Sequence, residues 1–325
     1  IYGIKEKKDK ESKNTGEPEK IIGINIDNQD KLFQQIEDTI RTNTDPAITS
    51  IIPYVVVVEN KKVLIIGIPK GLGLPSMTTF NNSNKFYRRK NTGKYLVDVN
   101  ELNDMFMKNQ VLKEKAQLYR KERIEKILSK ESFPNLDTSR FCVVHIIPFS
   151  FLNENFIDLS KVHYDNDLRK LIIPMVYYSL KQEYNIYGYV GYDEHKHNNY
   201  TQIIRNGVVE LYSAISTYRP SNQNYPDCTY GTEIYNMIFK NISKGLEIIK
   251  RFNVEEPFLI SVYFHNMENL NFSIDNHNVH IINCPKIPLP FITLPTYDSD
   301  LKLALKPLFD ILWQCANFNE CNINE

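Results

Sequence analysis

The sequence predicts an α+β protein with two domains and a helical connector between them. Both halves of the chain contain short runs of β-branched and aromatic residues, and also stretches with the spacing of an amphipathic helix. The length, 325 residues, favours two hydrophobic cores over one. A strongly charged helical stretch separates the halves. We therefore predict a mixed sheet with helices in residues 1–106, a helical connector at 107–133 and a mixed α/β domain at 138–325.

The first domain is predicted to contain short strands, one hairpin and one complete helix. Residues 1–4 are typical of a strand, whereas residues 5–20 are rich in Lys and Glu without an apolar period and predict a solvated hairpin loop. Asn28 or Asp30 can serve as the N-cap of the helix. The other predicted elements are a strand at 21–24, the helix at 30–42, a hairpin of strands at 53–58 and 62–68, a loop at 69–84, a strand at 85–89 and a second helix from residue 99.

The connector is predicted as a helix over residues 108–130, which Pro134 terminates. Its apolar side chains are spaced to line one side of the helix: Val111, Leu112, Leu118, Ile124, Ile127 and Leu128. Lys and Arg residues elsewhere on the helix are interleaved with Glu114, Glu122 and Glu125. Such mixed charge is typical of a solvated helix face stabilised by pairs three or four residues apart, so we interpret it in that way.

The second domain is predicted to alternate strands and helices. Residues 140–147 are almost continuously apolar, as expected for a strand that is buried on both faces. The pair Asn206-Gly207 lies between two β-rich runs and predicts a hairpin over 200–212 with a type I′ turn. The other predicted elements are a helix at 230–251, strands at 258–264, 279–284 and 291–294, and a last helix at 300–316.

Charge and composition limit the function. The formal net charge is zero, so a polyanionic partner would need a local basic surface. One such run exists, because residues 61–94 contain eight Lys or Arg and no Asp or Glu. The five cysteines lack Cys-x-x-Cys spacing, which indicates reduced thiols. No apolar run approaches the roughly 20 residues of a membrane span, so we expect no membrane partner and a cytoplasmic location.

The candidate nucleic-acid-binding residues lie on one predicted strand and the turn after it: Lys85, Tyr87, Arg88, Arg89, Lys90 and Lys94. The two-residue period of a strand places Phe86 and Arg88 on one face and Tyr87 and Arg89 on the other. One face can then pack on the domain while the other presents a guanidinium and a phenol to phosphates and a base. On this chemistry alone, a solvated edge strand protected from aggregation by its charges is the favoured interpretation.

The order of elements in residues 1–106 resembles the divergent AlbA-like domain of Schlafen proteins and their bacterial relatives. The pieces that carry the resemblance are, in order, Tyr2-Gly3-Ile4, Gly23-Ile24, Ile51-Ile52-Pro53, residues 63–69, and Tyr87-Arg88-Arg89 followed by residues 98–102. Residues 138–325 are similar to the long C-terminal extension of many bacterial members, including the ending Leu308-Phe309-Asp310-Ile311-Leu312-Trp313. The resemblance implies a nucleic-acid-binding sheet for DNA or RNA, and it reverses the preference at the basic strand in favour of binding.

The resemblance also implies, for some members, an RNA-cleaving site built from three carboxylates and a divalent metal such as Mg²⁺ or Mn²⁺. Glu6 stands where the third carboxylate would fall, with Asp9 and Glu11 as neighbouring acids. The first two positions have no counterpart, and we expect the natural chain to begin upstream of Ile1. The implied function is a metal-dependent RNase acting on tRNA or single strands in bacterial stress or phage defence. Glu6 would be its catalytic and metal-binding residue.

Other motifs have simpler structural interpretations. His195 and His197 follow two acidic residues and have ligand types that suit zinc, but their polar segment is more typical of a hairpin loop. His145 lies in an apolar strand and is interpreted as a hydrogen-bonded core residue. The glycine-rich loop at 71–76 lacks the Gly-Lys-Ser/Thr of a phosphate loop, so no nucleotide cofactor is expected.

A non-catalytic role is the alternative, because these 325 residues contain no complete catalytic set. In that hypothesis the chain is a sensor or interaction protein. Its C-terminal domain would bind another protein, such as a defence-system partner, or form homo-oligomers. Metal-stimulated cleavage of tRNA or single strands by the protein with its full N-terminus would distinguish the two.

Overall fold

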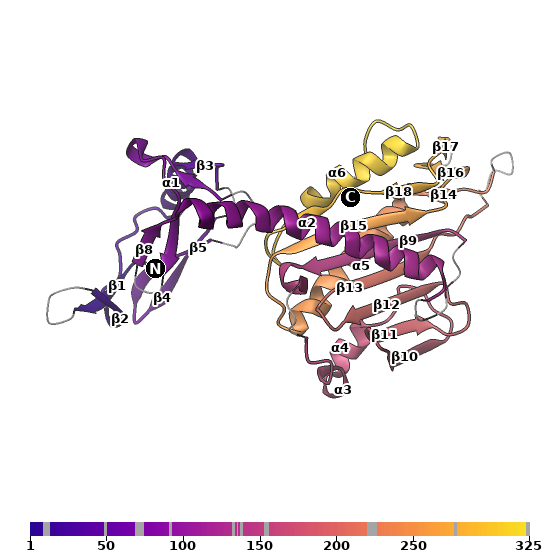
Figure 1. Ribbon diagram of the computed structural model, residues 1–325, viewed down its shortest axis with the longest axis horizontal. Helices are drawn as coiled ribbons and strands as arrows, with labels where there is room; N and C mark the ends of the chain where they lie inside the picture. Colours follow the sequence, from indigo (N-terminus) through magenta and orange to yellow (C-terminus); the bar gives the residue numbers. More distant parts are fainter. Residues whose placement is uncertain are drawn as a thin grey trace. The chain divides into compact units, whose positions relative to one another are not determined.

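The chain forms two compact units, Ile1–Lys113 and Glu114–Glu325 (Figure 1). The computed structural model describes residues 1–8, 14–48, 51–68, 75–90, 93–131, 134, 136, 139–152, 156–219, 226–275 and 278–322. Helices and strands occur in similar proportion and the sheets have mixed orientations, which confirms the α+β class. The unit boundary falls inside one long helix, α2 (Val99–Leu128), so the helix predicted from residue 99 and the one at 108–130 are continuous.

Within the described residues, unit 1 contains antiparallel strand pairs and the helix α1 (Gln29–Thr42). The pairs are β1 (Ile4–Lys8) with β2 (Asn14–Ile21), β3 (Thr44–Asp45) with β6 (Met77–Thr78), β4 (Ile52–Val58) with β5 (Lys61–Gly67), and β7 (Tyr87–Lys90) with β8 (Gly93–Leu96). Single bridges connect some of them: Tyr2 pairs with Leu64, and Thr78 pairs with Lys85. A short 3-10 helix, η1, spans Phe80–Asn82.

Two local predictions in unit 1 are confirmed. Asn28 is the N-cap of α1, because its side chain accepts a hydrogen bond from the backbone N–H of Lys31 at 2.9 Å. The predicted hairpin forms between β4 and β5, with Glu59 and Asn60 as its two-residue turn. Both turn residues have positive φ, 51° and 62°, as a type I′ turn requires.

The prediction of a loop at residues 5–20 is wrong for most of that segment. β1 and β2 occupy its two ends, and residues 9–13, which include Asp9 and Glu11, lie outside the described part of the chain. Ion pairs cross between the strands, from Lys5 to Glu19 at 3.0 Å and from Lys7 to Glu17 at 3.1 Å. Because these strands are almost fully exposed, they have no apolar period, and this is why the sequence pattern resembled a loop.

Unit 2 is built on an antiparallel sheet with strand order β10-β11-β12-β13-β9-β15-β18, where β19 also pairs with β15. The strands are β9 (Phe141–Pro148), β10 (Leu180–Tyr184), β11 (Gly188–Asp193), β12 (Asn199–Ile204), β13 (Val209–Ala214), β15 (Phe258–His265), β18 (Lys286–Pro288) and β19 (Ile292–Leu294). Every residue of β9 is buried, which confirms the strand predicted at 140–147. A smaller sheet joins β14 (Thr229–Tyr230), β16 (Leu270–Ser273) and β17 (Val279–Ile282), with β14 parallel to β16.

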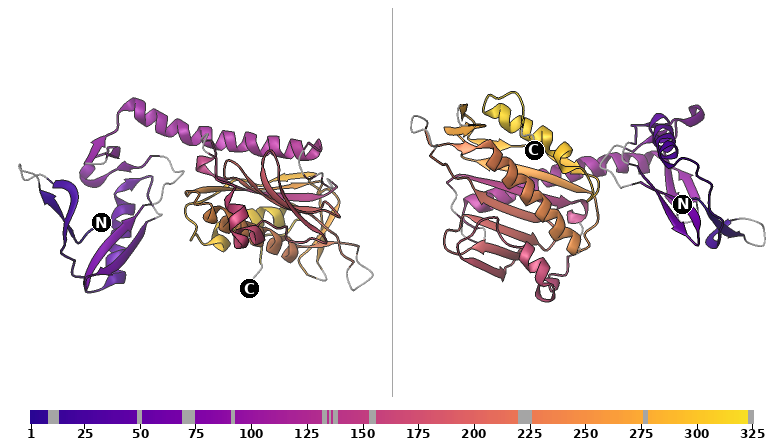
Figure 2. Two further views of the ribbon diagram at one scale, coloured as in Figure 1. Left: turned by 90° about the horizontal axis from the view of Figure 1, so that it is seen from below. Right: turned by 180° about the vertical axis from the view of Figure 1, so that it is seen from behind.

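Helices cover both faces of the main sheet (Figure 2). The helices α5 (Gly231–Arg251) and α6 (Leu301–Cys315) pack on one face, where Val144, Leu211 and Ile260 belong to the larger apolar cluster. The second half of α2 packs on the other face through Ile124 and Ile127. The short elements of this unit are η2 (Phe149–Leu152), α3 (Lys161–Tyr164) and α4 (Asn166–Leu171). Among the described residues, no helix is both long enough and apolar enough to cross a membrane.

Two details of the predicted elements are corrected. Leu118 was placed on the apolar side of α2, but 57% of its surface is exposed, whereas Ile127 is fully buried. The hairpin of β12 and β13 forms as predicted, but its turn is not type I′. Gly207 has positive φ while Asn206 does not, and the loop closes with bonds from Gly207 N to Ile204 O and from Ile204 N to Val208 O, both 2.8 Å. That pattern is a three-residue loop, in which glycine is needed only at the last position.

Candidate nucleic-acid interface

The inner face of the β7–β8 hairpin packs against the start of α2. The Phe86 ring makes an edge contact with Phe106, with centroids 6.5 Å apart. Arg88 Nη1 lies 3.7 Å from Glu101 Oε1, and the Tyr95 hydroxyl donates to the same oxygen at 2.9 Å. Arg88 therefore lies on the packed face, as its spacing from Phe86 predicted, and a carboxylate already neutralises part of its charge.

The outer face of the hairpin presents Tyr87, Arg89 and Lys94. Arg89 is directly opposite Lys94 in the strand pairing, so the two cations share one face. The Lys94 ammonium lies 4.8 Å from the centroid of the Tyr87 ring. Among the described side chains, no carboxylate forms an ion pair with Arg89 or Lys94. This face thus combines an aromatic ring with two cations whose charges are not neutralised.

The other basic residues of the run contribute unequally. Lys85 is exposed and lies directly before β7, next to its bridge with Thr78. The side chain of Lys90 lies outside the described residues, as do Asn91 and Thr92 of the turn and Gly71 and Gly73 of the glycine-rich loop. Lys61 donates to the carbonyl oxygen of Ile21 at 2.8 Å, and Lys62 donates to that of Ile26 at 3.2 Å. These two ammonium groups therefore stabilise the fold of unit 1.

Glu6 lies in the middle of β1, opposite Pro18 of β2. The nearby acids Glu17 and Glu19 are engaged by Lys7 and Lys5. Across the described ranges, no group of three or more His, Cys, Asp or Glu side chains is arranged to hold a metal ion. The described residues around Glu6 therefore do not form the three-carboxylate site that the resemblance implies.

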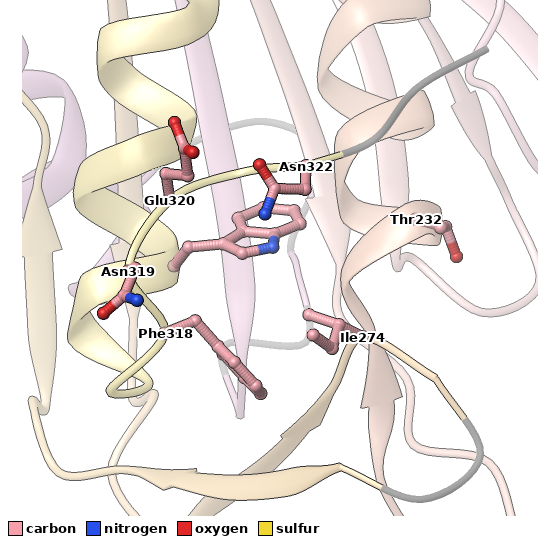
Figure 3. Close-up of a pocket in the computed structure, with 7 residues that line it drawn as sticks. Thr232, Ile274, Phe318, Asn319, Glu320 and Asn322 are labelled. Carbon is pink, nitrogen blue, oxygen red and sulfur yellow. The ribbon is translucent and has the colours of Figure 1, made fainter.

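Unit 2 has an open hollow of about 440 Å³ near the end of α6 (Figure 3). Its lining combines three apolar side chains with four polar ones: Ile274, Trp313, Phe318, Thr232, Asn319, Glu320 and Asn322. Glu320 already forms an ion pair with Lys306 at 3.0 Å. The lining thus supplies apolar surface and amide groups rather than an activated acid or base.

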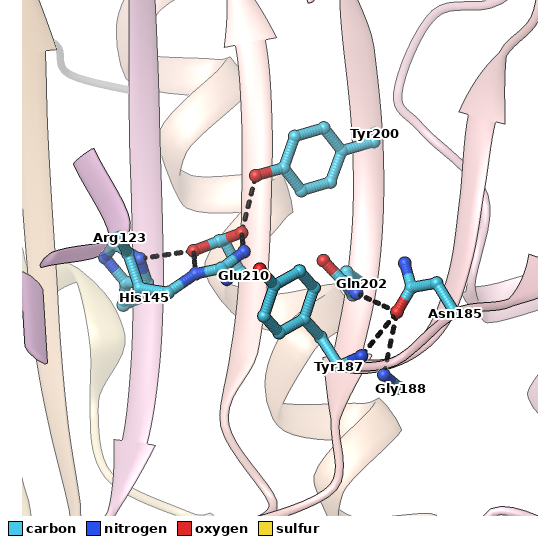
Figure 4. Close-up of polar contacts among 8 residues, drawn as sticks. All are labelled: Arg123, His145, Asn185, Tyr187, Gly188, Tyr200, Gln202 and Glu210. Atoms are coloured by element: carbon cyan, nitrogen blue, oxygen red, sulfur yellow. Dashed lines mark hydrogen bonds and ion pairs between the residues drawn. The ribbon is translucent and has the colours of Figure 1, made fainter. Parts of the chain in front are cut away.

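A buried polar cluster centred on Glu210 lies on the face of the main sheet that α2 covers (Figure 4). Arg123 on α2 donates two hydrogen bonds to the carboxylate, from Nε at 2.8 Å and from Nη2 at 2.6 Å. His145 Nε2 lies 2.8 Å from Oε2, and because a carboxylate only accepts, this nitrogen carries the proton. The Tyr200 hydroxyl donates to Oε1. The Arg123 guanidinium also lies over the Tyr187 ring, 4.7 Å from its centroid.

The charges of this cluster stabilise each other. Burial alone would raise the pKa of Glu210, but the Arg123 charge and the hydrogen bonds from Arg123 and His145 hold that pKa below its usual range. Only 5% of the Arg123 side chain and 0% of Glu210 are exposed. The Tyr119 hydroxyl and His145 Nδ1 are also buried and find no partner among the described residues, a cost that the ion pair must outweigh. We interpret the cluster as the anchor of α2 on the sheet, because a substrate could not reach it.

Sequence reasoning missed Glu210 and Arg123, although one signal was present. Strand alternation puts Glu210 and Tyr212 on one face of β13 and Val209 and Leu211 on the other. A carboxylate between apolar residues of a buried strand predicts a buried cation as its partner. Arg123 is 87 positions away in the sequence, so the pattern could not identify it.

The histidine interpretations agree with the structure. His145 is fully buried and hydrogen-bonded, as predicted for a core residue. His195 and His197 lie in the loop between β11 and β12, where His197 has a positive φ of 49°. The Asp193 carboxylate accepts from the backbone N–H groups of Tyr178 and His195, at 3.1 and 3.0 Å. This carboxylate therefore organises a turn.

Lys244 on α5 makes the stability of unit 2 depend on pH. Its ammonium is largely buried, donates to Ile173 O at 2.6 Å and Thr201 Oγ1 at 2.9 Å, and has no carboxylate partner among the described residues. Burial lowers its pKa from 10.5 to about 8. Between these pH values the unfolded chain binds more protons, so this residue makes the free energy of unfolding rise with pH. Denaturant titrations from pH 7 to 10 should show that Lys244→Met removes this rise. Parallel pH profiles for the two proteins would contradict the assignment.

Comparisons of the chain with protein-family models, with curated proteins and with solved structures find no match. The resemblance to Schlafen AlbA-like domains therefore stays a prediction from the sequence. The physical support for a binding site comes from the outer face of the β7–β8 hairpin.

Proposed function

We propose that unit 1 binds single-stranded nucleic acid through the outer face of the β7–β8 hairpin. The observation that carries the proposal is the position of Arg89 directly opposite Lys94 on this face. Like charges directly opposite each other destabilise a strand pair. A phosphate bound between the two cations would replace this repulsion with two charge-assisted contacts. The pairing therefore favours a polyanionic ligand.

Tyr87 supports a single strand as that ligand. Its ring lies on the same face as the two cations, with Lys94 Nζ 4.8 Å from the ring centroid. Surfaces that bind single strands combine cations along the backbone path with aromatic rings on which unpaired bases stack. Arg88 has a smaller role in the proposal, because Glu101 lies 3.7 Å from it.

Binding rather than cleavage is proposed. The cleavage that the resemblance implies needs several carboxylates around a metal ion. Of the acids on β1 and β2, Glu17 and Glu19 form ion pairs with lysines, and Glu6 has no such partner among the described residues. One carboxylate does not make a site of that kind.

The charge reversal Arg89→Glu with Lys94→Glu is expected to weaken binding of a labelled 20-nucleotide RNA by about two orders of magnitude, because each lost phosphate contact costs about tenfold. Fluorescence anisotropy at several salt concentrations measures this directly. For a single strand, the slope of log affinity against log salt should also fall by about 1.4, or about 0.7 for each contact.

A matched control separates the site from net charge. Lys31→Glu with Arg41→Glu makes the same change in charge on the exposed side of α1 in unit 1. We expect this variant to bind almost as the wild type does. Equal losses in both variants, or a wild type that does not bind at low salt, would contradict the proposal. Stronger binding to a duplex than to the single strand would contradict the stacking role of Tyr87.

A further inference from the structure

Among the described strands, β10 lies at an edge of the main sheet in unit 2 and pairs with β11 alone. Ser179 O accepts from Glu194 N at 2.8 Å, and Asn185 N donates to Gly188 O at 2.9 Å, so odd-numbered residues turn their backbone groups toward β11. The residues that turn their N–H and C=O groups away from the sheet are Leu180, Gln182 and Tyr184. None of these backbone groups bonds to another described residue.

This edge is short and carries Lys181 and Glu183, but it lacks two other features that usually protect edge strands. It contains no proline, and its register with β11 runs without a bulge from Leu180 to Tyr184. Large apolar side chains are exposed along it and at its ends: Leu180 is 37% exposed, Tyr184 52%, Tyr178 68% and Ile186 82%. A regular, open edge with exposed apolar neighbours is typical of a surface that pairs with another strand.

The sequence of β10, Leu-Lys-Gln-Glu-Tyr, is complementary to itself when it is reversed about Gln182. An antiparallel second β10 centred on Gln182 places Lys181 opposite Glu183 of the second copy, and Glu183 opposite Lys181 of that copy. Leu180 then lies opposite Tyr184. We propose that β10 pairs with β10 of a second copy of this chain about a two-fold axis at Gln182, which joins the two main sheets into one.

The backbone geometry fits this pairing. Because the groups of Leu180, Gln182 and Tyr184 point outward, they fall at the hydrogen-bonded positions of the new pair. Lys181 and Glu183 then fall at the non-hydrogen-bonded positions, where opposite side chains come closest. Within one chain Lys181 Nζ already lies 3.4 Å from Glu183 and 3.5 Å from Glu194, so the dimer would enlarge an existing ion-pair network. A self-complementary patch of this kind generates a closed dimer.

The opposite face of β10 offers a place for the aromatic side chain of the second copy. Gln182 Nε2 is held there by Arg169 O and Ile172 O, both at 2.8 Å. An open hollow of about 320 Å³ borders the strand on this side. Its lining residues are Asn166, Arg169, Lys170, Ile173, Tyr177, Leu180 and Gln182. Tyr184 of the second copy would lie opposite Leu180, at the border of this hollow. Its hydroxyl donates to Leu159 O of its own chain at 3.2 Å, and its half-exposed ring can pack against Leu180.

Charge-reversal variants test the pairing in sedimentation velocity runs over a range of concentrations. The wild type is expected to dimerise in the micromolar range. Lys181→Glu alone and Glu183→Lys alone should each weaken the dimer at least about tenfold, because each places like charges opposite at two positions. A mixture of the two variants should form a heterodimer, and the double variant Lys181→Glu/Glu183→Lys should dimerise again.

The controls distinguish the strand pairing from other effects. Lys240→Glu reverses an exposed charge on α5, away from the β10 edge, and should leave the dimer unchanged. Leu180→Pro removes an outward N–H without removing a β10–β11 bond and should weaken the dimer. A wild type that stays monomeric at high micromolar concentration would overturn the proposal. So would single variants that dimerise as the wild type does, or a mixture that gives no heterodimer. These outcomes do not depend on nucleic-acid binding by unit 1.

Discussion

Replacing Arg123 with methionine is expected to lower the free energy of unfolding of unit 2 by about 3–5 kcal/mol, because it leaves the Glu210 carboxylate buried without its cation. Glu210 is fully buried and accepts two hydrogen bonds from the guanidinium. Methionine keeps much of the volume of the arginine stem, so the loss reports mainly on the ion pair. The chain has one tryptophan, Trp313, and it lies in unit 2, so its fluorescence during denaturant unfolding follows this unit.

Two further variants show whether the ion pair itself is responsible. Arg120 lies one turn earlier on α2 and donates to the carbonyl of Leu289 at 2.8 Å, with the Phe291 ring 4.5 Å from its guanidinium. Because no carboxylate depends on it, Arg120→Met should cost only about 1 kcal/mol. Adding Glu210→Leu to Arg123→Met should recover part of the loss, because it removes the buried unpaired charge. The recovery is incomplete because the buried donors of His145 and Tyr200 lose their acceptor. Equal losses for the two arginines, or no recovery in the double variant, would show that the anchor lies elsewhere.

Elements with one dominant local signal could be predicted from the sequence. β9 is recognisable from the sequence because most of its residues are apolar. This is the pattern expected of a strand whose residues are all buried, as those of β9 are. α5 and α6 have strongly amphipathic sequences, and their predicted bounds differ from the observed ones by one residue. In these segments the local pattern and the tertiary packing favour the same structure, so no long-range information was needed.

Elements without an apolar pattern of their own could not be predicted. β10 carries two charges in five residues and becomes a strand because β11 supplies its hydrogen bonds. β1 and β2 are exposed on both faces, so no alternation marks them. Arg123 is one of many charged residues in the sequence of α2. Its contact with Glu210 of β13 distinguishes it from its solvated neighbours, and the sequence does not show this contact. In each case the partner segment determines the structure, and the segment's own residue pattern does not reveal it.

The candidate interface, too, could be predicted from the sequence only in part. The two-residue period correctly separated Phe86 and Arg88 from Tyr87 and Arg89. It could not identify Phe106 and Glu101, at the start of α2, as the residues that cover the face of Phe86 and Arg88. The structure moves the centre of the proposed surface from Arg88 toward Arg89 and Lys94.

Replacing Gly191 with alanine is expected to destabilise unit 2 by about 3 kcal/mol, because the added carbon would overlap a backbone oxygen. A Cβ atom at this position would lie 2.0 Å from the carbonyl oxygen of Ile172. This carbonyl cannot easily move away, because it accepts a hydrogen bond from Gln182 Nε2 at 2.8 Å. Ile172 also follows directly after the last residue of α4, which restrains its backbone. Trp313 fluorescence in denaturant again gives the free energy of unfolding, and exchange of the Ile172 N–H reports whether the end of α4 loosens.

Gly93→Ala is the matched control, because no atom of the described residues lies within 4 Å of the Cβ that it would add. That change should alter stability by less than about 1 kcal/mol, and its effect shows how much the loss of glycine freedom contributes by itself. Gly93 lies in unit 1, which has no tryptophan, so circular dichroism is the measurement for this variant. If Gly191→Ala were as stable as the wild type, Ile172 would have to move away from β11. One of the two hydrogen bonds that hold Gln182 would then be lost, and the edge strand β10 would be less firmly fixed for pairing with a second copy.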